Sequence, residues 1–439
     1  MNQIHWNRIF KASVSGSLGL SLFAGSVLAD TSDDASHPFC LEGNFMVADA
    51  QNSPFSSVPG PGRILELNLN TGERGITVDS PKEALEALGL TNVWKPTGVL
   101  SGGADGHAFI AGSAWHTISE FHRDGDHIRT IRLPTAAPIS AGPGAMPTLN
   151  GLQFMPNGNI IVTVCDHKVT DTSVFPPLSS TPQQNANSRL VVLDPETLQM
   201  IDEYSQPANG DPRWSCPSDI IFSSEGMLVS TFHGAATFVI DWKAGAKNVK
   251  KPGQFKPADL NKDENRSKVV RVIDMYPDAP LNDPRRRDSL RAATFGSNGT
   301  LYVVNRARAK EVGNGPSDNR AHIDVIPWGE SGPVGTLAMD HGIQVIAGAR
   351  TNRISAKGCA KLRETEPTNS CDFETLLVAS SSTGKVHEFR IGAEFLDGPD
   401  CRDHNTGCAQ PIADFLGPEN GQDKIDPRML MIIHESFIQ

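Results

Sequence analysis

Three histidines that each follow an apolar segment could together bind a metal ion. They are His116, His167 and His233, in the contexts Ala-Trp-His-Thr, Cys-Asp-His-Lys and Thr-Phe-His-Gly. If the segments before them are equivalent strands of one repeated unit, the three imidazoles occupy equivalent turns and can converge. Three imidazoles can hold one transition-metal ion and leave a coordination position for water or substrate, as catalytic sites require. The alternative is that one or two of these histidines are only polar turn residues.

A second set of polar residues lies before or at the start of other apolar segments. It comprises Asn150, Ser218 with Asp219, and Arg291. Oxygen atoms from several chain segments suit a hard cation such as Ca²⁺, and Arg291 could bind an anionic group of a substrate through two hydrogen bonds. Asn and Asp also often begin strands only to satisfy nearby backbone groups, and the neighbouring arginines at 285–287 could form a solvated turn. Asp219 and Arg291 are the candidate catalytic residues of this set.

Seven cysteines follow residue 29, and their spacing predicts disulfides. Two pairs each close a short loop: Cys359 with Cys371, and Cys401 with Cys408. Cys165 ends one apolar segment and Cys216 precedes another, so we expect both on the same face of neighbouring units. They form either a disulfide or, as the alternative, a thiolate metal site with His167. The state of Cys40 stays open.

These positions depend on a repeat of an apolar strand, a glycine-containing turn, a second apolar strand and, a few residues later, a third. The clearest first strands begin at 150, 219 and 291, and Asn-Gly or Glu-Gly pairs mark the turns. The third strand recurs six times, at 63–69, 118–123, 189–195, 237–242, 322–328 and 386–391. The pattern predicts an all-β fold, a β-propeller of six blades with four antiparallel strands each. Four further histidines fall in or beside outer strands and are expected at the surface or in packing contacts: His122, His127, His322 and His387.

The two ends of the chain are expected to complete one blade. Residues 44–49 resemble a second strand with no first strand before it, and residues 429–437 resemble a strand without a blade. An independent C-terminal helix is the alternative. Residues 30–439 would then form one propeller domain, interrupted by loop insertions near 167–188, 243–268, 306–321, 350–374 and 392–410.

The first 29 residues are typical of an export signal. Arg8 and Lys11 precede an apolar stretch at 18–24 and a small-residue cleavage site at 27–29. The apolar stretch is shorter than the roughly 20 residues that a membrane-spanning helix needs. We therefore expect a periplasmic or secreted protein that does not span a membrane.

Composition argues against several classes of function. Acidic residues outnumber basic ones by 50 to 39, for a net charge of −11, so a phosphate backbone would be repelled on average and nucleic acid is not expected as a partner. The chain also lacks a glycine-rich phosphate loop and a Cys-x-x-Cys-His motif. We therefore expect no nucleotide, flavin or haem cofactor.

Two copies of the repeat resemble known propeller families. Residues 216–229 resemble an NHL-type repeat, and residues 150–158 are similar to the asparagine-bearing strand of the gluconolactonase (senescence marker protein) family. Enzymes of that family hold a divalent metal with Glu, Asn and Asp, which implies Glu42, Asn150 and Asp219 as an alternative metal site here.

The peptide-amidating lyase, another NHL-type propeller, holds zinc with histidines from separate blades, which is the pattern of His116, His167 and His233. The expected protein is an exported propeller with a zinc or calcium site at the mouth of its channel. It would act on a small molecule as a metal-dependent lactone or ester hydrolase, or as a lyase. The alternative is a non-catalytic propeller that binds a peptide, a glycan or another protein.

Overall fold

The structure is a computed structural model in which the chain divides into Met1–Ser36 and His37–Gln439. The described residues all belong to the second unit: 44–49, 62–90, 94, 96–102, 106–112, 116–133, 145–171, 178–179, 188–205, 211–232, 234–242, 251, 254, 268–281, 283–286, 290–305, 322–338, 346–380, 383–391, 411–415 and 427–432. The predicted export signal, Cys40, and the predicted pair Cys401 and Cys408 lie outside them.

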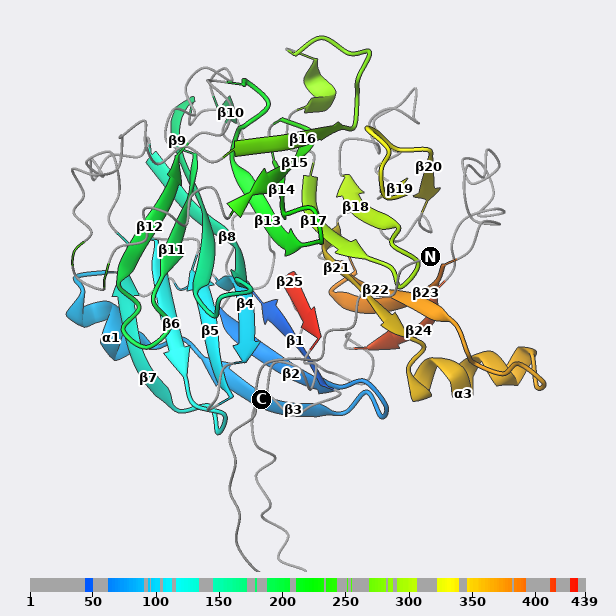
Figure 1. The fold of residues 1–439 in the computed structure, drawn as a ribbon. Helices are drawn as coiled ribbons and strands as arrows, with labels where there is room; N and C mark the ends of the chain where they lie inside the picture. Colours follow the sequence, from blue (N-terminus) through cyan, green and yellow to red (C-terminus); the bar gives the residue numbers. More distant parts are fainter. Residues whose placement is uncertain are drawn as a thin grey trace, which may run out of the picture. The chain divides into compact units, whose positions relative to one another are not determined.

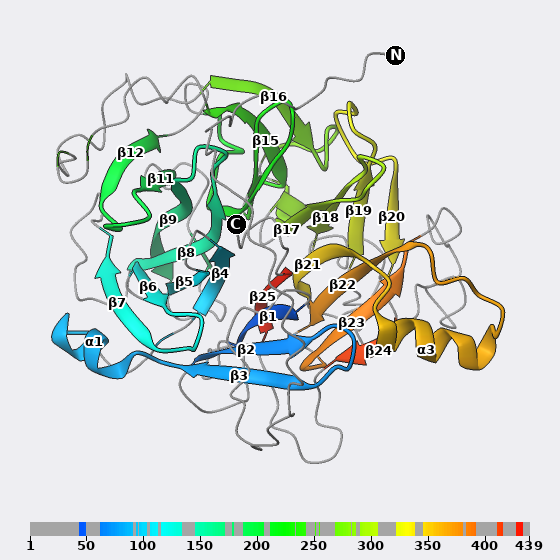
Figure 2. The same cartoon turned by 60° about the horizontal axis from the view of Figure 1, so that its bottom comes forward.

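Six antiparallel sheets are arranged as the blades of a β-propeller (Figures 1 and 2), which confirms the predicted fold. We number the blades along the chain and give the strands of each from the innermost outward. Blade one comprises β25 (Pro427–Ile432), β1 (Asn44–Asp49), β2 (Arg63–Asn68) and β3 (Arg74–Asp79). Blade two comprises β4 (Pro96–Gly102), β5 (His107–Gly112), β6 (Thr117–Phe121) and β7 (His127–Arg132). Blade three comprises β8 (Ala145–Phe154), β9 (Ile160–Asp171), β11 (Arg189–Leu193) and β12 (Met200–Ser205), with the short β10 (Leu178–Ser179) beside β9.

The other three blades repeat this order. Blade four comprises β13 (Pro217–Phe222), β14 (Met227–Thr231), β15 (Ala236–Asp241) and β16 (Lys268–Asp274). Blade five comprises β17 (Leu290–Phe295), β18 (Leu301–Asn305), β19 (His322–Ile326) and β20 (Gly335–Ala338). Blade six comprises β21 (Ile346–Arg353), β22 (Glu374–Ser380), β23 (Lys385–Arg390) and β24 (Pro411–Phe415). The six predicted third strands are β2, β6, β11, β15, β19 and β23, and each occupies the third place in its blade.

The chain ends close the ring as predicted. β25 pairs antiparallel with β1, with Phe45 opposite Ile432 and Ala48 opposite Met429. The innermost strands contact one another in the cyclic order β4, β8, β13, β17, β21, β25 and back to β4. The alternative of a C-terminal helix is therefore wrong for residues 427–432, because the first blade lacks an innermost strand until the end of the chain supplies it.

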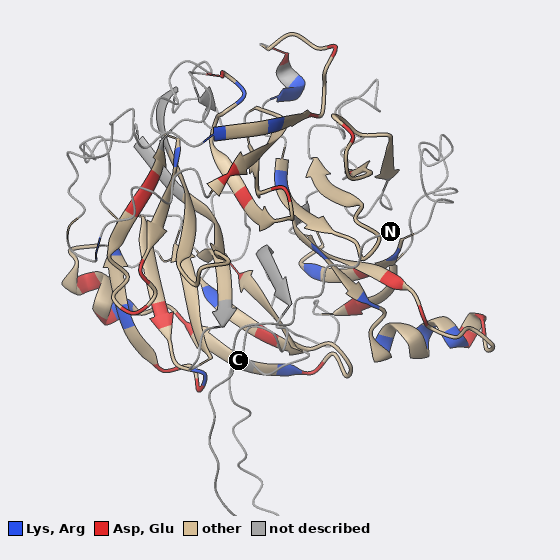
Figure 3. Ribbon diagram, viewed as in Figure 1, with Lys and Arg blue, Asp and Glu red and all other residues tan. Residues whose placement is uncertain are grey.

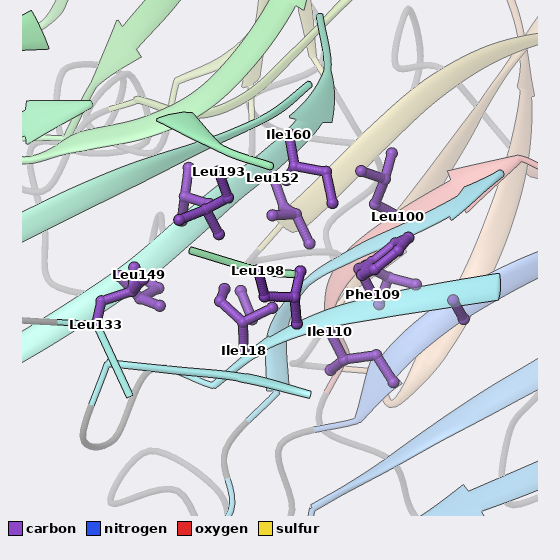
Figure 4. Close-up of a cluster of buried hydrophobic side chains, with 14 of the residues drawn as sticks. Leu100, Phe109, Ile110, Ile118, Leu133, Leu149, Leu152, Ile160, Leu193 and Leu198 are labelled. Atoms are coloured by element: carbon purple, nitrogen blue, oxygen red, sulfur yellow. The ribbon is translucent and has the colours of Figure 1, made fainter. Parts of the chain in front are cut away.

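Apolar residues fill the space between neighbouring blades. In the cluster between blades two and three, Leu100 and Phe109 pack near Leu152 and Ile160 (Figure 4). Adjacent blades cover both faces of the second strands, so the residues of these strands are buried continuously rather than alternately. All five residues of β14, for example, are buried.

Among the described residues, two α-helices lie outside the blades. α1 (Lys82–Ala87) connects blades one and two. α3 (Ala356–Thr365) lies between β21 and β22, within the segment 350–374 that the sequence suggests as a loop insertion. Ser355 caps α3 by accepting a hydrogen bond from Gly358 N at 2.8 Å, and Glu388 on β23 accepts from both the backbone and the hydroxyl of Ser355. A third helical segment, η5 (Pro284–Arg286), is a 3₁₀ turn before β17.

Two of the predicted disulfides are present. Cys359 of α3 is bonded to Cys371, and Cys165 at the mouth end of blade three is bonded to Cys216. Disulfides of this kind are typical of proteins in an extracellular or periplasmic compartment. None of the helices in the described part of the chain has the length and apolar character needed to cross a bilayer.

Close approach of the innermost strands leads to a first prediction. A Cβ atom at Gly151 of β8 would lie 2.9 Å from Asp219 Cα of β13, and both are backbone positions that cannot turn aside. We expect Gly151→Ala to lower the free energy of unfolding by about 1–3 kcal/mol. Gly75→Ala is the control, because its Cβ would have ordinary contacts, 3.5 Å at the nearest, and should change stability by less than about 0.5 kcal/mol. Denaturant unfolding of both variants tests this, and equal effects would contradict the tight contact.

Candidate functional site

The innermost strand of every blade carries a β-bulge against the second strand, with one extra residue on the first strand. In five blades the register shifts where the first strand passes the end of the second. In blade three both strands continue past the shift, to Ala145 and Asp171. In blades three and five the shift spans two residues of the first strand, 150–151 and 291–292. We call the first residue within each of the six shifts the bulge ring: Thr97, Asn150, Ser218, Arg291, Ala347 and Arg428. Bulges bend a strand and redirect its side chains, and they are common beside active sites.

Three of the residues suggested by the sequence therefore occupy equivalent places. Asn150, Ser218 and Arg291 are the bulge-ring members of blades three, four and five, which are consecutive in the ring. First strands begin where second strands end, so these residues lie on the same face as the turns that follow the second strands. We call it the mouth face. The structure thus brings the second candidate set together at one level of the propeller.

Arg291 lies against an aromatic ring on the mouth face. Its guanidinium carbon is 3.8 Å from the centroid of the Phe232 ring, and Phe232 directly follows β14 of blade four. The backbone N–H of Phe232 donates to the Cys216 carbonyl at 2.8 Å, which ties this turn to the segment before β13. Stacking on an aromatic face holds a guanidinium in one plane, a geometry that suits recognition of a carboxylate or phosphate.

Asp219 of blade four contacts blades five and six, and both of its carboxylate oxygens accept hydrogen bonds from the protein. Its Oδ2 accepts from Ala293 N of blade five at 2.9 Å and from Arg350 Nη1 of blade six at 3.3 Å, while Oδ1 accepts from Ile220 N at 2.9 Å. The residue is 2% exposed. Burial raises the pKa of Asp219, and the nearby Arg350 charge and the backbone donors oppose that rise. Because both oxygens are engaged by protein donors, this environment suits a structural contact rather than the metal site implied with Glu42 and Asn150.

Of the three histidines of the first candidate set, the described residues include all of His116 and the backbone of His167. His116 lies in the turn after β5, as expected, and is fully buried with a left-handed backbone (φ 53°). His167 lies on β9 opposite Met146, and its side chain is outside the described residues, as is all of His233. Within the described parts of the chain, no group of three or more His, Cys, Asp and Glu residues is placed to hold a metal. The three-histidine site therefore stays a prediction.

The disulfide between Cys165 and Cys216 stabilises the mouth between blades three and four. The two sequence positions are 51 residues apart, and both side chains are buried. Ser188 adds to this contact, since its hydroxyl accepts from Cys216 N at 3.0 Å and its carbonyl accepts from Trp214 Nε1 at 2.8 Å. A disulfide sulfur is not a thiolate, so the alternative of a cysteine-containing metal site with His167 is wrong.

A buried ionic cluster that the sequence did not indicate supports the loop before Arg291. Arg286 is 3% exposed and donates to both oxygens of Asp274, at 2.8 and 3.2 Å, and to the Ala279 carbonyl at 3.1 Å. Arg213 donates to the same carboxylate at 3.1 Å. The interpretation of 285–287 as a solvated basic turn is therefore wrong for Arg286. The sequence does not predict these contacts because Arg213, Asp274 and Arg286 lie in separate segments of the chain.

Comparisons with known proteins give only distant likenesses. No protein family and no curated protein matches the chain in sequence. Among solved structures, a protein of unknown function from Bacteroides caccae shares 12% identity over 89% of this chain and 98% of its own, with a TM-score of 0.46. The periplasmic gluconolactonase of Pseudomonas aeruginosa shares 10% over 88% and 98%, with a TM-score of 0.42. Virginiamycin B lyase of Staphylococcus aureus shares 12% over 75% and 72%, with a TM-score of 0.36.

The contact between Asp219 and Arg350 leads to a second prediction. Arg350→Ala should leave a buried carboxylate with only backbone donors and lower the free energy of unfolding by about 2–4 kcal/mol at neutral pH. Without Arg350, the folded-state pKa of Asp219 rises further above its unfolded value, so the deficit should shrink as the pH falls and Asp219 takes up a proton. Arg353→Ala, at an exposed ion pair of the same strand, should cost less than about 0.5 kcal/mol. Unfolding measured from pH 7 to pH 4 checks this, and a deficit independent of pH would count against it.

Proposed function

We propose that the mouth face binds a small organic molecule with an anionic group and that the protein is a metal-dependent hydrolase of an ester or lactone, or a lyase. The observation that carries this proposal is the bulge ring, in which an amide, a hydroxyl and a guanidinium come from three consecutive blades. Arg291, held against Phe232, would bind the anionic group, and the amide of Asn150 would offer a hydrogen bond beside it.

The donor set that fits a metal best is His116, His167 and His233. Imidazole nitrogens suit zinc, whereas calcium prefers oxygen ligands, and the Asp219 oxygens are engaged elsewhere. The burial of His116 supports a ligand role, because burial fixes the ring and excludes competing water. A zinc ion, when bound, would polarise a carbonyl group or lower the pKa of a bound water.

Binding without catalysis is the second candidate function, with a peptide, a glycan or another protein as the ligand. It is supported by the engagement of Asp219 and of both mouth cysteines in structural contacts, which leaves fewer groups for chemistry. We place either activity in the periplasm or outside the cell, with residues 1–29 as the export signal; N-terminal sequencing of the mature protein should begin near Asp30.

The histidine site gives a third prediction. We expect the mature protein to retain close to one zinc ion per chain after mild purification, and His116→Ala, His167→Ala and His233→Ala each to lose most of it, because ligands act together. His122→Ala, at an exposed histidine, is the control and should keep the metal. Elemental analysis alongside circular dichroism measures this. Folded variants that all retain zinc, or a wild-type protein with none, would favour the binding function.

Arg291 gives a fourth prediction. If a lactone or ester substrate with an anionic group is found by a pH-indicator screen, Arg291→Ala should raise KM by about tenfold or more, since a charged hydrogen bond contributes about 1.5–3 kcal/mol. Arg291→Lys keeps the charge but loses the planar guanidinium, so its KM should lie between that of the wild type and that of Arg291→Ala. An unchanged KM in both variants would remove Arg291 from the site.

A further inference from the structure

A hydroxyl, an imidazole and a carboxylate form a continuous array in blade six. Thr383 Oγ1 lies 2.8 Å from His387 Nε2, and His387 Nδ1 lies 2.7 Å from Asp414 Oδ1. Lys385 Nζ donates to Asp414 Oδ2 at 3.0 Å. These residues belong neither to the bulge ring nor to the three-histidine set. The order of groups is that of a nucleophile, a base and an orienting acid, which is recognised by geometry rather than by sequence position.

The sheet itself holds the array together. His387 on β23 pairs directly with Asp414 on β24, and the strands of this blade lie side by side in Figures 1 and 2. Thr383 lies in the turn between β22 and β23, where Ser380 pairs with Lys385. Gly384 in this turn has φ 65° and donates to the Ser380 carbonyl at 3.0 Å. Because the turn joins the second and third strands, Thr383 lies on the mouth face, in the turn of blade six that is equivalent to the turn of His116 in blade two.

The charges set the direction of the hydrogen bonds. Burial raises the pKa of Asp414, but hydrogen bonds and charges from His387 and Lys385 outweigh it and lower that pKa to about 2. The carboxylate is therefore ionised at neutral pH and can only accept. When the imidazole of His387 is neutral, this carboxylate keeps the ring proton on Nδ1, so Nε2 is the acceptor and the Thr383 hydroxyl donates to it.

We propose that Thr383 is an acyl-accepting nucleophile, with His387 as its general base and Asp414 as the positioning residue, and that this array hydrolyses small esters. The exposure of the first two groups agrees with these roles. His387 is only 4% exposed, whereas Thr383 is half-buried, so of the two it is the threonine that solvent reaches. The activity goes beyond the proposed mouth site, since it needs no metal.

The reaction balances with an ester and water alone. Thr383 Oγ1 attacks the carbonyl carbon while its proton passes to His387 Nε2. The bond to the leaving alcohol then breaks, and the alcohol leaves with that proton. A water molecule repeats the sequence on the threonyl ester, releases the acid and restores the hydroxyl.

Blade two offers a matched comparison within the same chain. His127 Nε2 lies 2.8 Å from Thr130 Oγ1, which reproduces the contact between hydroxyl and imidazole, and Thr130 Oγ1 also lies 2.9 Å from Ser119 Oγ. No carboxylate among the described residues bonds to that imidazole. If a hydroxyl beside an imidazole were enough, Thr130 would react as readily as Thr383.

A fluorophosphonate probe tests the proposal on the full mature protein. The attacking oxygen displaces fluoride and forms a stable phosphonyl ester, which peptide mapping locates. We expect labelling of Thr383 but not of Thr130, and the same labelling after treatment with a chelator. Thr383→Ala should abolish it, and Thr383→Ser should restore or increase it, because the smaller residue keeps the hydroxyl.

The positioning role needs a separate readout. Asp414 is 34% exposed, so Asp414→Asn is expected to fold, as circular dichroism would check. We expect its maximal labelling rate to fall at least about tenfold with little change in the probe concentration for half-maximal rate, because orientation of the base is lost. Labelling of folded wild type that is absent at Thr383, or equal at Thr130, would overturn the proposal. Loss of labelling with the chelator would instead place the activity at the metal site.

Discussion

The fold depends on how closely the innermost strands approach one another around the ring. Just after the bulges of blades two and three, at Gly98 and Gly151, the strand passes its neighbour with room for little more than a backbone. A Cβ atom at Gly98 would lie 2.8 Å from the carbonyl oxygen of Asn150 in the next blade. At the equivalent place in blade four stands Asp219, a charged residue. The strand has room for this side chain because the carboxylate extends toward blades five and six and accepts hydrogen bonds from both.

The same constraint explains why the candidate residues lie where they do. Small residues after the bulge, such as Gly98 and Gly151, allow the inner strands to approach closely. The bulge residue before them is outside this close contact, so its side chain can differ in type from blade to blade. Asn150, Ser218 and Arg291 occupy that place, whereas Asp219, one residue later, belongs to the tightly packed ring. A shift of one residue along a strand thus separates a group available for binding from a group that stabilises the fold.

Local patterns made the blades predictable, but the ionic contacts between blades did not follow from them. The third strands, the closure by residues 427–432 and the bond between Cys359 and Cys371 follow from alternation, from an unpaired strand at each end and from short spacing. The pair Asp219 and Arg350 is separated by 131 positions and depends on which blades are neighbours. Helix α3 was not predicted, because its sequence is largely polar and the segment 350–374 was interpreted as a loop. His387, interpreted as a surface or packing residue, acquires its partners only through the register of β23 with β24.

Buried carboxylates elsewhere help to distinguish structural contacts from reactive ones. Acidic and basic residues are interspersed over the described strands (Figure 3). Several buried carboxylates accept hydrogen bonds from another segment and so hold the two segments together. Glu388 binds the start of α3 through Ser355, and Glu120 binds Arg129 and His107. Asp414 differs, because the chain of contacts from it continues through an imidazole to a half-buried hydroxyl. A carboxylate that only joins two segments completes its role in the folded state, whereas one that orients a base beside a hydroxyl prepares a proton transfer.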